Sequence, residues 1–144
     1  MKKIIILSGG FDPLHIGHSR MFKAAKNQDA IVIVGANSDS WLTRKKGQPF
    51  MPQAERVEIL KAIKYIDYVY TFDDSDDSAC NLIEKVINKY KDDKVKLFFG
   101  NGGDRTIEST PEIEYCDENG IEMLWEVGGG KIQSSSDLIK NIDK

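Results

Sequence analysis

The chain has 144 residues, of which 40% are hydrophobic and 30% are charged, so it is long enough for one domain with its own core, residues 1–144, and short for two. Its 20 basic and 23 acidic residues give a net charge of −3, which argues against a generally basic nucleic-acid binder. The apolar runs are far shorter than the roughly 20 residues that span a bilayer, so no membrane partner is expected.

Apolar stretches alternate with amphipathic ones along the chain. The β-branched run before Gly9 predicts a first buried strand, and the pattern that follows predicts a helix over 16–27. Residues 37–53 show no clear periodicity and predict a loop, which ends where Pro52 opens a helix. The acidic run that begins at Asp73 offers N-caps for a helix to about residue 90. The predicted strands cover 3–7, 30–35, 67–72, 95–99 and 121–127, and the remaining predicted helices lie near Pro111 and over 134–142.

Strands that alternate with helices run parallel and are joined by right-handed crossovers. The sequence therefore predicts a single Rossmann-like α/β domain, with a five-stranded parallel sheet and helices on both faces. Ligands bind such sheets beyond the carboxyl ends of the strands. Four segments should meet at that edge: 9–18, 37–47, 100–105 and the residues before the last helix.

The segment 9–18 contains both histidines of the chain, His15 and His18, three residues apart at the expected junction of strand and helix. This spacing puts both imidazoles on one face of a helical turn, and a helix start suits an anion such as a polyphosphate. Gly17 lies between them and would let a ligand approach the backbone. The alternative is a pair of structural histidines. No metal site is expected, since a third His and a Cys pair are lacking.

Residues 10–18 resemble the His-x-Gly-His signature of the cytidylyltransferase-like nucleotidyltransferases. The resemblance covers nearly the whole chain, because further motifs follow in the family's order. It extends to the glycerol-phosphate and ethanolamine-phosphate cytidylyltransferases and to the adenylyltransferase domain of ADP-heptose synthases. The further motifs are 37–39, 46–49, Glu55 with Arg56, 66–69, Gly103 with Asp104, and 134–136.

The resemblance implies an enzyme that joins a nucleoside triphosphate to a small phosphorylated acceptor and releases pyrophosphate, by in-line attack without a covalent intermediate. Such catalysis is mostly positioning and charge neutralisation. His15 and His18 would contact the nucleotide phosphates, and Gly17 would lie between them. The nucleotide would also be held by Gly9, Gly10, Phe11 and Asp12, of which Asp12 either orders the loop or reaches a metal through water.

The family pattern also assigns roles outside the first motif. Lys46, with Lys45 as the contender, would fold over the substrate or the triphosphate from the 37–53 loop; the alternative is a solvated basic loop. Arg56 resembles a family arginine that reaches the substrate phosphate, and the alternative is a surface arginine paired with Glu55 or another neighbour. Asp39 belongs to the same substrate-binding group.

Two further segments are expected at the nucleotide. Ser134, Ser135 and Ser136 would present hydroxyls and helix-start amides to the β- and γ-phosphates, although an N-cap needs only one of them. Gly103 and Asp104 would lie beside the base or ribose, with a plain strand-end turn as the alternative. Outside the site, a half-buried Trp41 and a solvated acidic run over 73–77 are expected.

Two departures from the pattern of the glycerol-phosphate cytidylyltransferases leave the identity of the nucleotide base open. The glycerol-phosphate enzymes carry an arginine before the last helix, where this chain offers Lys131, and they place Gly-Thr where this chain has Gly9 and Gly10. CTP with a small polyol or sugar phosphate is slightly favoured. The alternatives are ATP with a heptose or other sugar phosphate, and a non-catalytic nucleotide-binding module. We further expect Mg²⁺ bound with the triphosphate, a homodimer, and reduced cysteines in a cytoplasmic protein.

Overall fold

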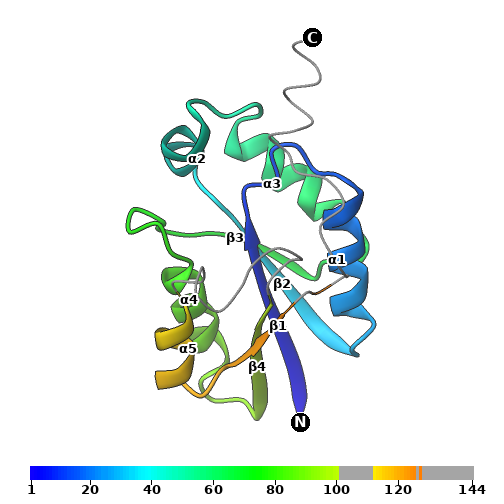
Figure 1. Ribbon diagram of the computed structural model, residues 1–144. Helices are drawn as coiled ribbons and strands as arrows, with labels where there is room; N and C mark the ends of the chain where they lie inside the picture. Colours follow the sequence, from blue (N-terminus) through cyan, green and yellow to red (C-terminus); the bar gives the residue numbers. More distant parts are fainter. Residues whose placement is uncertain (101–111, 126, 128–144) are drawn as a thin grey trace.

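Five parallel strands form the centre of the molecule (Figure 1), in the order β3-β2-β1-β4-β5. The computed structural model describes residues 1–100, 112–125 and 127. The strands are β1 (Lys2–Gly9), β2 (Ala30–Ala36), β3 (Tyr68–Thr71), β4 (Val95–Gly100) and β5 (Glu122–Leu124). The helices are α1 (Ile16–Lys26), α2 (Asp39–Lys46), α3 (Gln53–Lys61), α4 (Cys80–Tyr90) and α5 (Ile113–Glu118).

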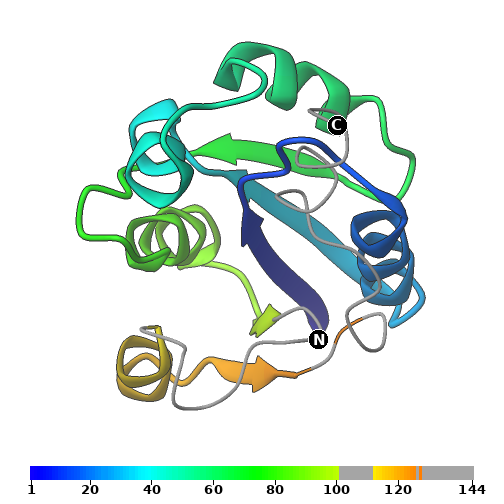
Figure 2. The ribbon, with the colours of Figure 1, turned by 45° about the horizontal axis from the view of Figure 1, so that its top comes forward.

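The helices cover both faces of this sheet, as predicted. Alternate side chains of β1 point to opposite faces, so Ile5 joins one core and Ile6 the other. The first core includes Phe22 of α1 and Leu60 of α3, and the second includes Leu82 of α4. Figures 1 and 2 show α1 and α3 on one side of the sheet and α4 and α5 on the other. A central strand buried on both faces explains the uninterrupted apolar run at the chain start.

The strand order places the predicted site at a topological switch point. β1 pairs with β2 on one side and with β4 on the other, so successive connections leave β1 in opposite directions. Ligands bind open α/β sheets in the crevice at such a point, beyond the carboxyl ends of the strands. The 9–18 motif follows β1 directly and therefore lies at this crevice.

The prediction of a loop over 37–53 is wrong for its first half, because residues Asp39–Lys46 form α2. Ser38 caps the helix by accepting a hydrogen bond from the Trp41 amide, and Gly47 ends it with a φ of 96°. A helix of two turns with one buried residue, Leu42, carries too little apolar pattern to be recognised by periodicity. In Figure 1, α2 lies beyond the carboxyl end of β2.

The prediction of a solvated acidic run over 73–77 is wrong for Asp74. Asp74 is buried, and its carboxylate accepts hydrogen bonds from the Ser38 amide (2.8 Å), the Ser38 hydroxyl (2.7 Å) and Asn37 Nδ2 (2.9 Å). Arg44 donates to the Asp74 carbonyl oxygen at 2.8 Å and pairs with Asp77 at 2.9 Å. The loop after β3 thus holds α2 near both of its ends.

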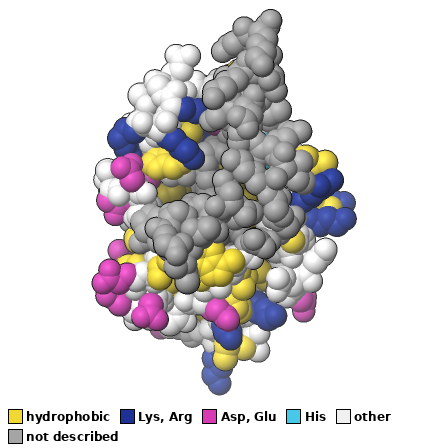
Figure 3. Space-filling model, in the orientation of Figure 1, with side chains coloured by type: hydrophobic (Ala, Val, Ile, Leu, Met, Phe, Trp, Pro, Cys, Tyr) yellow, Lys and Arg dark blue, Asp and Glu magenta, His cyan; other side chains and the backbone are white. Residues whose placement is uncertain are grey.

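Within the part of the chain that the structure describes, no helix combines the length and apolar character needed to cross a membrane. Basic and acidic side chains both occur on the described part of the face in Figure 3.

Candidate active site

The two histidines cap the first helix through their own ring nitrogens. His15 is the N-cap of α1, and its Nδ1 accepts a hydrogen bond from the Gly17 amide at 3.0 Å. Nδ1 of His18 in turn accepts from the His15 amide at 3.2 Å. The rings stack with centroids 3.9 Å apart and planes 22° from parallel. The prediction that three-residue spacing brings both imidazoles to one face is confirmed.

These hydrogen bonds select the tautomer of both rings. A neutral imidazole that accepts at Nδ1 carries its proton on Nε2. Burial, assisted by the neighbouring His15, lowers the pKa of His18 from 6.5 to about 3. His18 is therefore neutral at pH 7 and can offer an Nε2–H donor without first losing a proton.

The lowered pKa of His18 predicts acid sensitivity. Below pH 6.5 an unfolded His18 binds a proton that the folded protein does not bind until about pH 3, so acidification favours unfolding over that window. For each pH unit below 6.5, this histidine should lower the free energy of unfolding by up to about 1.4 kcal/mol, which can be measured between pH 7 and pH 5. Urea unfolding at both pH values should show a larger loss in the wild type than in His18→Asn. Equal losses of stability in the two proteins would contradict the lowered pKa of His18.

Phe11 packs against the ring of His18, on which His15 also stacks. Its side chain is buried, and it meets His18 edge to face at 5.0 Å and Phe22 at 5.5 Å between ring centroids. To place the ring there, the Phe11 backbone adopts a φ of 52°, which non-glycine residues rarely do. A Cβ on Gly9 would lie 3.0 Å from the same ring. The loop is therefore shaped around the histidine pair.

Gly17 serves the His15 ring, a role that its sequence position did not predict. A Cβ at Gly17 would lie 2.8 Å from His15 Cε1 and 3.0 Å from Nδ1, too close for the ring to stay in place. We predict that Gly17→Ala lowers turnover by at least about 10-fold, roughly 1.4 kcal/mol of transition-state stabilisation. Its free energy of unfolding should change little, because the roughly 1 kcal/mol by which alanine favours the helix offsets the cost of displacing the His15 ring. Parallel turnover and urea-unfolding measurements check this, and unchanged turnover would be the contrary result.

Asp12 connects the motif to the end of α2 and to the segment that follows it. Its carboxylate is buried and accepts hydrogen bonds from the amides of Phe50 (2.6 Å) and Met51 (2.7 Å). Lys46, in the last turn of α2, pairs with this carboxylate at 2.9 Å and donates to the Asp12 carbonyl oxygen at 2.7 Å. The Lys46 side chain is 15% exposed, so the alternative of a solvated basic loop is wrong at this position.

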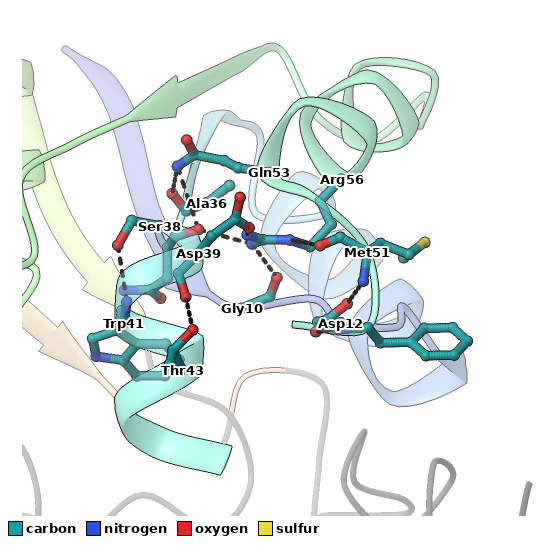
Figure 4. Close-up of polar contacts among 12 residues, drawn as sticks. Gly10, Asp12, Ala36, Ser38, Asp39, Trp41, Thr43, Met51, Gln53 and Arg56 are labelled. Atoms are coloured by element: carbon teal, nitrogen blue, oxygen red, sulfur yellow. Dashed lines mark hydrogen bonds and ion pairs between the residues drawn. The ribbon is translucent and has the colours of Figure 1, made fainter. Parts of the chain in front are cut away.

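Arg56 is buried, so the alternative of a surface arginine is wrong. Figure 4 shows it reaching from α3 to Gly10, Met51 and Asp39. Asp39 pairs with it at 2.7 Å, although the Asp39 side chain is 47% exposed. On α2, Lys45 Nζ lies 4.7 Å from the centre of the half-buried Trp41 ring.

Comparison with known proteins decides the family. The model of the cytidylyltransferase-like family matches residues 6–126, which include the histidine pair, α2 and Arg56. The chain belongs to the cytidylyltransferase-like family.

Curated relatives of this cytidylyltransferase-like domain share the name bifunctional protein HldE. The chain is 42% identical to that of Geobacter metallireducens over 98% of its own length, and 32% identical to that of Geobacter sulfurreducens over 99%. In both cases it spans 27% of the relative. The chain is thus similar to about a quarter of each of these longer proteins.

Two solved structures share the fold. A lipopolysaccharide core biosynthesis protein from Thermoplasma volcanium aligns with a TM-score of 0.65 at 19% identity, covering 87% of this chain and 94% of that one. A putative nicotinate-nucleotide adenylyltransferase from Vibrio parahaemolyticus aligns at 0.58 and 18%, covering 99% and 81%.

The predicted site residues of the cytidylyltransferase-like domain fall into two groups. The structure brings together the described ones at the carboxyl end of β1 and around α2. The other group lies outside the described residues: Gly103, Asp104, Lys131, Ser134, Ser135 and Ser136. Sequence reasoning missed the part played by Asp74, although a polar Asn37-Ser38 pair directly after a buried strand is a signal that a polar partner is needed.

The described residues do not fit a magnesium site built by the protein alone. Among them, no three His, Cys, Asp or Glu side chains gather as metal ligands. The Asp12 oxygens receive two amides and Lys46, which supports loop ordering over contact with a metal.

Proposed function

We propose that this domain transfers a nucleotidyl group from a nucleoside triphosphate to a small phosphorylated acceptor and releases pyrophosphate. The observation that carries the proposal is the stacked pair of histidines at the switch point, with each Nδ1 bonded to the backbone and each Nε2 left with the ring proton. Two neutral donors fixed on one helix start suit the oxygens of a transferring phosphoryl group.

In the proposed reaction, an acceptor phosphate oxygen attacks the α-phosphorus, and the bond to the bridging oxygen of pyrophosphate breaks on the opposite side. The Nε2–H groups of His15 and His18 donate to phosphate oxygens as negative charge shifts toward the leaving group. Lys46, at the end of α2, adds a positive charge once it leaves the Asp12 carboxylate with which it pairs. The side chains make no covalent bond to phosphorus, so their contribution is positioning and charge neutralisation.

For the substrates we place ATP with a phosphorylated sugar ahead of CTP with a polyol phosphate, which the sequence alone slightly favoured. The chain resembles the adenylyltransferase domain of ADP-heptose synthases, and the curated relatives named here are all HldE. The Ser8-Gly9-Gly10 start of the motif also looks like adenylyltransferase branches. Mg²⁺ bound to the triphosphate and a homodimer remain predictions, as does the contact of 134–136 with the phosphates.

The test is a substrate panel. The protein is incubated with Mg²⁺ and each of ATP, CTP, GTP and UTP against sugar and polyol phosphates, and pyrophosphate release is measured. Release with ATP and a sugar phosphate supports an adenylyltransferase, and release with CTP and a polyol phosphate supports a cytidylyltransferase. Nucleotide binding with no release from any pair would favour the non-catalytic module.

A further inference from the structure

The Arg56 guanidinium is enclosed by the chain's own oxygen atoms. The side chain is 0% exposed, and its five N–H groups donate four hydrogen bonds to surrounding oxygen atoms. Nε donates to the Met51 carbonyl at 3.0 Å, and Nη1 donates to the carbonyls of Gly10 and Asn37, each at 2.8 Å. Nη2 donates to Asp39 Oδ1 at 2.7 Å. A phosphate that bound this group would have to displace these oxygens.

The hydrogen bond from Arg56 to the Gly10 carbonyl sets the direction of the Phe11 amide. In a trans peptide the C=O and N–H groups point opposite ways, so the Phe11 N–H points away from Arg56. The Gly9 carbonyl accepts from the Asn37 amide at 3.0 Å, and the same geometry turns the Gly10 N–H away from β2. The Gly10 N–H therefore points to the side of β1 on which β4 lies, and the switch point is between these two strands.

We propose that Arg56 is a positioning residue, which holds the Gly10–Phe11 peptide so that the amides of Gly10 and Phe11 face the nucleotide phosphates. It contacts neither substrate. The inference rests on the proposed function, in which this loop holds the nucleotide. A cation on the carbonyl side also polarises the peptide and strengthens its N–H as a donor. Lysine cannot reproduce this, because its ammonium lacks the planar fork that spans Gly10, Asn37 and Asp39.

The experiment compares the wild type with Arg56→Lys and with Arg20→Lys, an exposed arginine of α1 outside the site. KM for the nucleotide and KM for the acceptor are measured with the active pair from the substrate panel. Nucleotide affinity without acceptor is measured by calorimetry with Mg-ATP and Mg-CTP. Arg56→Gln, which keeps a side-chain amide donor, serves as the second variant if Arg56→Lys does not fold.

We expect Arg56→Lys to raise the nucleotide KM and Kd about 10-fold or more, with the acceptor KM within about twofold of wild type and Arg20→Lys unchanged. A rise in the acceptor KM would overturn the inference in favour of a phosphate contact. A lower kcat with both KM values unchanged would overturn it in favour of a purely structural role. A wild type that binds neither nucleotide would remove the proposed function itself, which separates that failure from the other two.

Discussion

Replacing His18 with asparagine should lower turnover by about 100-fold or more, which is roughly 2.7 kcal/mol of transition-state stabilisation. Asparagine keeps an oxygen near the place of Nδ1, where it can still accept from the His15 amide, but it removes the Nε2–H group. The substitution therefore separates the structural role of the ring from its role toward phosphate. Steady-state turnover under saturating substrates measures the effect.

His15→Asn is the matched companion, with a nearly equal loss expected. Asparagine is a favourable N-cap and can keep the bond from the Gly17 amide, so α1 should remain intact. Urea unfolding of both variants at pH 7 is the control, since a folded protein with low turnover isolates the catalytic effect. If both variants turn over at near wild-type rates, the histidines are structural and the catalytic assignment is wrong.

The second large effect concerns stability. Asp12→Ala should lower the free energy of unfolding by about 3 kcal/mol or more, because it leaves two amides and the Lys46 ammonium without their shared carboxylate in a buried place. Lys46→Met should cost less, since the Asp12 carboxylate keeps both amides. Urea unfolding at pH 7 measures both changes without any knowledge of the substrate.

Asp92→Ala provides the comparison, because Asp92 is exposed and such substitutions usually change stability by less than about 0.5 kcal/mol. An Asp12→Ala loss no larger than that of Asp92→Ala would contradict the idea that Asp12 ties the 50–51 segment and α2 to the motif.

The parallel strands and the position of the histidines could be predicted from the sequence because they depend on local patterns. The run over Ile4 to Leu7 needs burial on both faces, which only a central strand provides, and the spacing of His15 and His18 is set by one helical turn. Even α2 had local signals in Ser38 and Gly47, which its weak apolar pattern concealed.

The burial of Arg56 and Asp74 could not be predicted, because it depends on contacts between distant segments. Arg56 meets Gly10 46 positions away, and Asp74 meets Ser38 36 positions away. A charged residue on a short helix or in an acidic run is usually exposed, and nothing local indicates the carbonyls or amides that compensate its burial.

The most direct measurement follows pyrophosphate and the nucleotidyl product in one reaction, with the nucleotide and acceptor selected by the panel. If the acceptor phosphate attacks the α-phosphorus directly, both products form in a one-to-one ratio, and neither forms when the acceptor is left out. His15→Asn and His18→Asn should slow both equally. A burst of pyrophosphate without acceptor would contradict direct in-line transfer, and nucleotide binding without either product under any condition would contradict nucleotidyl transfer itself.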